Sequence, residues 1–201
     1  WTTPGVTVGG AAAPATLQLG GTGTDSPGNI TINAGTLRIS KASILAAVPT
    51  SSLLTLGTNG DVKIEYAGGD ISTLANNLNI DTSLAARTLT LSSAGGALPT
   101  QASTFTVGGL ILKTGAGGLN VIAQADTALD DGFNNLVRSP SRLVLSGAQT
   151  YTTDLQHNGG IVIGKGTIPA GSTASPFGTS VNPLTMNVTD STIGGMVADG
   201  L

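Results

Sequence analysis

Short triplets, in which two apolar residues flank a third residue, recur along the whole sequence and are mostly followed by Gly, Asn, Ser, Thr or Asp. Alternation of period two over so few residues predicts β-strands of three to five residues with one buried face. Many such strands with no helical stretches between them predict an all-β fold, a coiled stack of strands. The triplets are Leu17–Leu19, Ile30–Ile32, Leu37–Ile39, Leu54–Leu56, Val62–Ile64, Leu78–Ile80, Leu89–Leu91, Phe105–Val107, Leu110–Leu112, Leu119–Val121, Leu143–Leu145, Ile161–Ile163 and Leu184–Met186.

Two clusters of triplets resemble each other, as expected for a β-solenoid of parallel strands. Residues 16–40 and 142–164 each contain three strand patterns, and aligning them places Leu37 on Ile161 and Ile39 on Ile163. A coil of roughly 20 residues would divide the chain into about ten coils and give a stack about 50 Å long. The outer triplet residues should point inward and the central ones should face solvent. The residues expected to face solvent are Gln18, Thr31, Arg38, Thr55, Lys63 and Thr90.

A β-sandwich and a β-barrel are the alternatives, but both favour longer strands joined by hairpins. Asn59-Gly60 is the one pair placed to form such a hairpin.

Two regions depart from the triplet pattern. Residues 41–50 could form one helical turn that Pro49 ends. Residues 122–141 predict a long loop or lateral extension. Neither region predicts a domain boundary, so residues 1–201 are expected to form a single segment.

Composition narrows the classes of partner. The net charge of −3 and the scattered eight basic residues argue against a nucleic-acid or membrane-surface protein. The chain has no Cys, so stability must come from packing and strand hydrogen bonds, and no apolar run is long enough to span a bilayer. Because Trp1 begins without a signal peptide and Leu201 ends without a cap, we expect a fragment of a longer chain.

The two clusters also carry a recognisable repeat. Residues 143–153, with Leu143-Val-Leu-Ser-Gly and Thr150-Tyr-Thr, are followed by Asn158-Gly-Gly-Ile-Val-Ile-Gly and by the loop of residues 168–179. Residues 17–21 and 29–39 give a second, shorter match. This pattern resembles the passenger-associated transport repeat of autotransporters, from which Asp154-Leu-Gln-His departs. The resemblance implies a right-handed parallel β-helix on a bacterial cell surface or in a secreted protein, without implying one activity.

Candidate chemistry is sparse. His157 is the only histidine, has no nucleophile or acid placed beside it by a motif, and is expected on a surface turn. Asp130-Asp131 is the only adjacent acidic pair, and neighbouring strand residues face opposite ways. Residues 20–25 are weak as a calcium loop, and the Thr-x-Thr pairs are too irregular for an ice-binding face. We therefore predict no catalytic, cofactor-binding or metal-binding residues. The remaining acids, expected in turns, are Asp25, Asp61, Glu65, Asp70, Asp81, Asp126, Asp154, Asp190 and Asp199.

Three functions follow as expectations. The first is a non-catalytic β-solenoid segment of a bacterial surface or secreted protein, of the autotransporter or adhesin type, with a glycan or protein target that the sequence does not name. The second is an extracellular fibre or sheath subunit that stacks through open strand edges. The third is a β-helical carbohydrate-active enzyme, which would need clustered carboxylates. Self-association is the expected partner interaction, no cofactor is expected, and membrane contact would come from another part of the chain.

Overall fold

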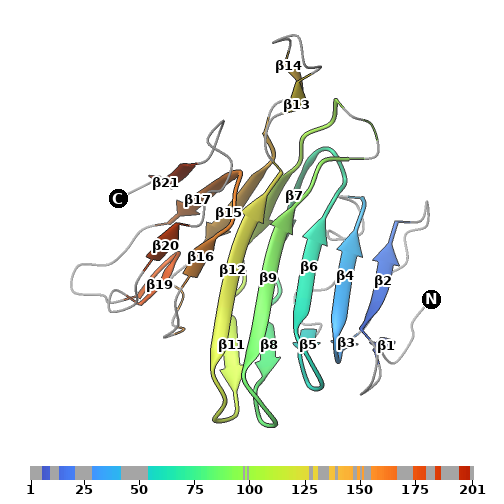
Figure 1. Ribbon diagram of the computed structural model, residues 1–201, viewed down its shortest axis with the longest axis vertical. Helices are drawn as coiled ribbons and strands as arrows, with labels where there is room; N and C mark the ends of the chain where they lie inside the picture. Colours follow the sequence, from blue (N-terminus) through green and yellow to red (C-terminus); the bar gives the residue numbers. More distant parts are fainter. Residues whose placement is uncertain are drawn as a thin grey trace.

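The computed structural model describes residues 6–9, 14–20, 29–41, 54–96, 98, 100–126, 129–130, 136–138, 140–146, 149, 151, 155–166, 174–179, 184–186 and 195–199. Within these residues the structure is all β, with no helix, and three parallel sheets hold most of the strands (Figure 1). The expectation of an all-β fold of short parallel strands is therefore confirmed. Every triplet identified in the sequence overlaps a strand.

The three parallel sheets are named here by roman numerals. Sheet I contains β1 (Val6–Val8), β3 (Ile30–Ile32), β5 (Leu54–Leu56), β8 (Leu78–Asp81) and β11 (Ile111–Thr114). Sheet II contains β2 (Ala15–Leu19), β4 (Gly35–Ile39), β6 (Val62–Tyr66), β9 (Arg87–Ser93), β12 (Leu119–Ala125), β16 (Leu155–His157) and β20 (Leu184–Met186). Sheet III contains β7 (Ile71–Leu74), β10 (Thr104–Val107), β15 (Arg142–Ser146), β17 (Ile161–Lys165) and β21 (Gly195–Asp199).

The chain visits the sheets in a fixed cycle through its middle part. From β5 to β15 it passes through sheets I, II and III in turn and then returns to sheet I. One passage through the three sheets is a round. Each strand therefore pairs with a strand of the previous round, not with its neighbour in sequence. Asn59-Gly60 lies between β5 of sheet I and β6 of sheet II, so it forms a corner between two sheets and not a hairpin.

The register between rounds is continuous, but its spacing is uneven. In sheet I, Ile30 lies opposite Leu54 and Leu54 opposite Leu78, so these two steps have equal length in the sequence. In sheet II, Leu17 is the partner of Leu37, whereas Ala123 is the partner of His157, so the later step is much longer than the earlier one. The predicted coil of roughly 20 residues therefore fits the first step of sheet II, while the later steps are longer. Sheet II accordingly has seven strands among the described residues, fewer than the predicted number of coils.

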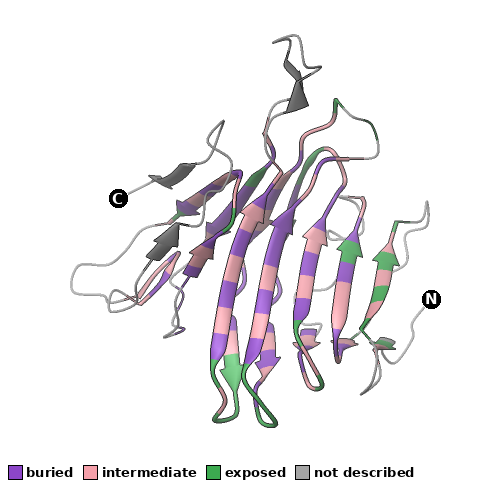
Figure 2. Cartoon of the chain, viewed as in Figure 1, coloured by how far each residue is buried: buried purple, intermediate pink, exposed green. Residues whose placement is uncertain are grey.

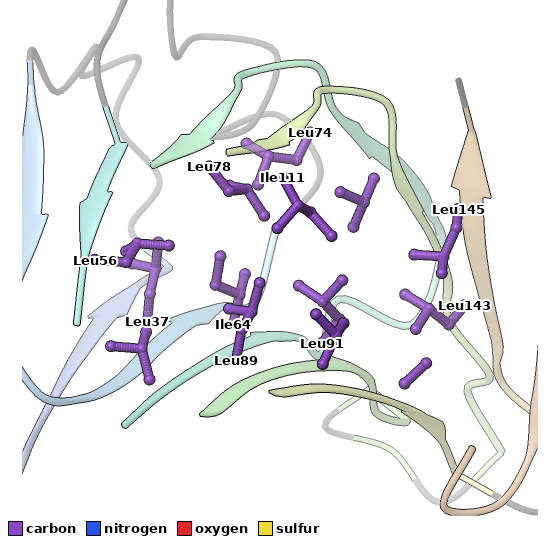
Figure 3. Packing of buried hydrophobic residues seen from close by; sticks show 14 of the residues in the cluster. Leu37, Leu56, Ile64, Leu74, Leu78, Leu89, Leu91, Ile111, Leu143 and Leu145 are labelled. Carbon is purple, nitrogen blue, oxygen red and sulfur yellow. The ribbon is translucent and has the colours of Figure 1, made fainter. Parts of the chain in front are cut away.

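The apolar core lies between the three sheets. Side chains from each sheet point into a shared interior, where Leu56 and Leu78 come from sheet I, Ile64 and Leu89 from sheet II, and Leu74 from sheet III (Figure 3). Figure 2 shows buried and partly exposed residues alternating along β6, β9 and β12. This alternation follows from the pleat, because successive side chains of a strand point to opposite faces.

Two triplets face the opposite way from the prediction. In β11, Ile111 is buried while Leu110 and Leu112 are partly exposed, and in β17 Val162 is buried while Ile161 and Ile163 are partly exposed. All three residues of each triplet are apolar, so their pattern does not specify which face is buried. The alignment of Leu37 with Ile161 also fails, because these residues lie in sheets II and III.

Close approach of the backbone explains a glycine at the start of β4. Gly35 has φ of 110°, and a Cβ there would overlap the carbonyl oxygen of Ala15 in β2. Only Gly combines this dihedral angle with this proximity at little cost. It allows β4 to begin in register with β2 immediately after the corner that follows β3.

Two antiparallel hairpins interrupt the cycle. One, β13 (Leu129–Asp130) and β14 (Leu136–Arg138), follows β12 and projects beyond the end of sheet II (Figure 1). The lateral extension predicted for residues 122–141 therefore starts too early, because residues 122–125 still belong to β12. The other consists of β18 (Ala174–Ser175) and β19 (Gly178–Thr179). The helical turn predicted for residues 41–50 lies almost wholly outside the described residues.

Candidate functional site

A shallow groove lies beside the start of β9 on sheet II, with a volume of about 300 Å³. Its polar side chains come from three consecutive strands or the corners before them. Asp61 precedes β6, Thr88 lies in β9 and Asn120 in β12, where it is the register partner of Thr88. The groove is lined by Asp61, Ala86, Arg87, Thr88, Gly118, Leu119 and Asn120.

Arg87 lines the groove and is only 8% exposed. Its Nε–H donates to the carbonyl oxygen of Gly57, its Nη2 donates to that of Thr58 at 2.9 Å, and its Nη1 donates to that of Ala86 at 3.2 Å. These bonds tie the corner before β6 to the first residue of β9. The guanidinium is thus occupied largely with backbone carbonyls, which identifies Arg87 as a structural clamp between rounds.

Two carboxylates accompany this cation without forming a salt bridge to it. Asp61 Oδ1 accepts the backbone N–H of Thr88 at 2.7 Å, so it supports the start of the ladder between β6 and β9. Hydrogen bonds from the side chain and backbone of Ser83 lower the pKa of Asp81, and the positive charge of Arg87 contributes less. On the outer face of sheet II, Glu65 forms salt bridges with Arg38 and Lys63.

The side chains of the groove can form hydrogen bonds, but they do not form a recognised catalytic arrangement. The groove combines a carboxylate, a hydroxyl and an amide, yet no side chain that lines it pairs a nucleophile with a base. Among the described residues, no three His, Asp or Glu side chains are placed to hold a metal ion. Likewise, no helix in the described part of the chain is long and apolar enough to cross a membrane.

His157 contradicts its predicted place on a surface turn. It lies in β16, is fully buried, and continues the inward column that contains Leu91 and Ala123. Its Nε2 lies 3.1 Å from the carbonyl oxygens of both Gly159 and Gly160. Because a carbonyl only accepts, Nε2 carries the hydrogen, and the buried Nδ1 has no hydrogen-bond partner among the described residues. The residue is therefore part of the core.

A ladder of buried serines was missed by sequence reasoning. Ser103 and Ser141 each immediately precede a strand of sheet III, and both are almost fully buried. The hydroxyl of Ser103 accepts the N–H of Gly69 at 2.9 Å, and that of Ser141 accepts the N–H of Ser103 at 3.1 Å. Each hydroxyl thus accepts a hydrogen bond from the backbone of the preceding round. A Ser two residues before a triplet is the weak signal that could have indicated this role.

The other sequence candidates remain dispersed. Asp130 lies in β13, while Asp131 and most of the loop at 20–25 lie outside the described residues. Thr88 and Thr90 lie in β9, and Thr104 and Thr106 lie in β10. These strands belong to different sheets, so the threonines form no continuous array.

Comparisons with protein-family models, with curated proteins and with solved structures find no match for this chain.

Proposed function

We propose that residues 1–201 belong to a right-handed parallel β-helix that serves as a non-catalytic structural segment of a bacterial cell-surface or secreted protein of the autotransporter or adhesin type. The observation that carries this proposal is the unbroken register of sheet II. There, Leu37, Ile64, Leu91 and Ala123 form one inward column across four neighbouring strands. A protein whose units stack in one direction forms an elongated body, and this shape suits a structural role.

The outer face of sheet II supports the same proposal. Thr36, Lys63 and Thr90 form one outward column, and Arg38 pairs with Glu65 across strands at 3.3 Å between Nε and Oε1. Such a face is hydrated by hydroxyl, amide and charged groups without concentrating one sign of charge. In this role the stacked rounds would hold a binding region away from the cell surface, and the target would be recognised elsewhere.

Removing one complete round tests the proposal. Deletion of residues 62–88 joins Asp61 to Leu89, the register partner of Val62, and should leave a folded chain about 4.8 Å shorter. Deletion of residues 62–87 is the matched control. It puts Thr88 at that position and turns the apolar residues of β9 to solvent, so it should prevent folding of the neighbouring rounds.

The readout should report function as well as folding. Each chain would be placed between an outer-membrane translocator and a folded reporter, and the surface exposure of the reporter would be measured on cells. Folding would be measured separately, by far-UV circular dichroism of the isolated segment. We expect the in-register deletion to keep both signals and the slipped deletion to lose both. If both deletions abolish folding equally, the rounds are not interchangeable units and the proposal fails. Release of reducing sugar from a polysaccharide panel by the parent chain would contradict a non-catalytic role.

A fibre subunit is the second candidate, because of one observation at the first strand of sheet II. The inward residues Leu17 and Leu19 of β2 are partly exposed, whereas their partners Leu37 and Ile39 are 1% exposed. Addition of another strand next to β2 would bury them. Replacing Leu17 and Leu19 with Lys should abolish concentration-dependent growth in light scattering if the chain polymerises through this edge, and should leave it unchanged if it does not.

A further inference from the structure

Among the described residues, sheet I ends earlier than the other two sheets. Its last described strand is β11, whereas sheet II continues with β16 and β20, and sheet III with β17 and β21. In sheet III, the step from Arg142 to Ile161 is half as long as the step from Thr104 to Arg142, which also contains hairpin β13–β14. The chain thus passes the edge of β11 and reaches β16 without a further described strand of sheet I.

A side chain occupies the place of that strand. Gln149 Oε1 accepts the backbone N–H of Ile111 at 2.8 Å, and its Nε2 donates to the carbonyl oxygen of Gly109 at 3.0 Å. A parallel neighbour would offer the same pair of groups, one acceptor and one donor, to this stretch of β11. A third bond, from Nε2 to the carbonyl oxygen of Ser146 at 3.2 Å, fixes the amide in this orientation.

The backbone that carries Gln149 is turned away from β11. Its N–H donates to the carbonyl oxygen of Ser175 at 2.9 Å in an isolated antiparallel bridge, and the N–H of Thr179 donates to the carbonyl oxygen of Tyr151 at 3.3 Å. Hairpin β18–β19 therefore covers the segment that would otherwise extend the sheet. Gln149 is 1% exposed, so its amide bonds to β11 are shielded from water.

We propose that Gln149 is an edge stop, which satisfies the outer edge of β11 and prevents this edge from pairing with a strand of a second copy of the chain. Open sheet edges recruit strands because their N–H and C=O groups lack partners. One glutamine amide satisfies one such pair without providing a continuing strand. Further along β11, the exposed Lys113 adds a charge of the kind that protects natural edges. This inference does not depend on the proposed structural role.

The test replaces the amide with an apolar side chain of similar size. Gln149→Leu should raise the apparent self-association constant at least tenfold over the parent in sedimentation velocity, at concentrations where both are folded by circular dichroism. Gln156→Leu is the matched control, because Gln156 lies partly exposed on the outer face of β16; it should sediment as the parent does. Adding Lys113→Pro to Gln149→Leu should restore the parent behaviour, because proline removes an N–H that points away from β8.

Each result decides the proposal. A folded Gln149→Leu chain that sediments as the parent overturns it, and so does association that Lys113→Pro fails to reverse. If Gln149→Leu does not fold, hydrogen exchange of the unmodified chain decides. The amide of Ile111 should then exchange at least tenfold more slowly than that of Lys113, and equal exchange rates would show that Gln149 does not satisfy the edge.

Discussion

Replacement of Arg87 with Met gives a sharp test of how successive rounds are held together. The substitution keeps the apolar stem and removes the three bonds to Gly57, Thr58 and Ala86. A hydrogen bond from a charged donor contributes about 1.5–3 kcal/mol to stability, and the bond to Gly57 is the buried one. The bonds to Thr58 and Ala86 are partly buried, so water can replace them at a cost of about 0.5 kcal/mol each.

Removing a buried cation also relieves a desolvation penalty, which offsets about 1 kcal/mol of the loss. The expected net effect is therefore a decrease of about 2 kcal/mol in the free energy of unfolding, a large share of a typical value of about 5–15 kcal/mol. Arg87→Lys should lose about half as much, because an ammonium is a compact point charge that lacks the planar fork of a guanidinium.

Urea unfolding followed by far-UV circular dichroism measures this difference. Arg142→Met is the matched control, because Arg142 is exposed on the outer face of β15 and the same change there should alter stability by less than about 0.5 kcal/mol. If Arg87→Met and Arg142→Met behave alike, the clamp interpretation is refuted. The Arg87 guanidinium would then be available to a ligand in the groove.

Three further predictions concern the core. Leu91→Ala should lower stability by about 2–5 kcal/mol in the same urea assay, whereas Leu84→Ala, at a side chain 74% exposed, should have little effect. Gly160→Ala should lower the melting temperature sharply, because Gly160 has φ of 69° and a Cβ would overlap a carbonyl of β12; an unchanged temperature would contradict this geometry. Burial raises the pKa of Tyr66 and Tyr151, so the unfolded chain ionises near pH 10 while the folded chain stays protonated. Stability should therefore fall above about pH 10 by up to about 1.4 kcal/mol per pH unit per tyrosine, and a double Tyr→Phe variant should show a shallower decline.

Local patterning predicted most strands of the three parallel sheets, because side-chain alternation depends on neighbouring residues alone, but no triplet covers β1, β7, β16 or β21. Leu54–Leu56 and Val62–Ile64 alternate apolar and polar residues, and such segments can bury only one face. The same reasoning failed for Leu110–Leu112 and Ile161–Ile163. There, every residue is apolar, so packing against the other sheets chose which side chain points inward.

The candidate site was less predictable than the fold. The expectation of isolated acids in turns fits Asp61 but is wrong for Glu65, Asp81 and Asp199, which lie in β6, β8 and β21. The bond of Asp61 to Thr88 joins residues 27 positions apart in the chain, so no local pattern could indicate it. Arg87 gave no motif, because its three partners are backbone carbonyls, which every residue possesses. The buried position of His157 likewise follows from its register with Ala123 in the neighbouring strand, which no short motif encodes.

Short strands with one apolar face can be predicted from this sequence, because side-chain alternation is a local property of a few residues. The division of those strands among three sheets, the distance in the sequence between successive rounds, and the end of the described part of sheet I follow from the tertiary structure. These features depend on contacts between residues that are distant along the chain, such as Arg87 with Gly57 and Gln149 with Ile111. Their energies exist only after the rounds have been brought into register.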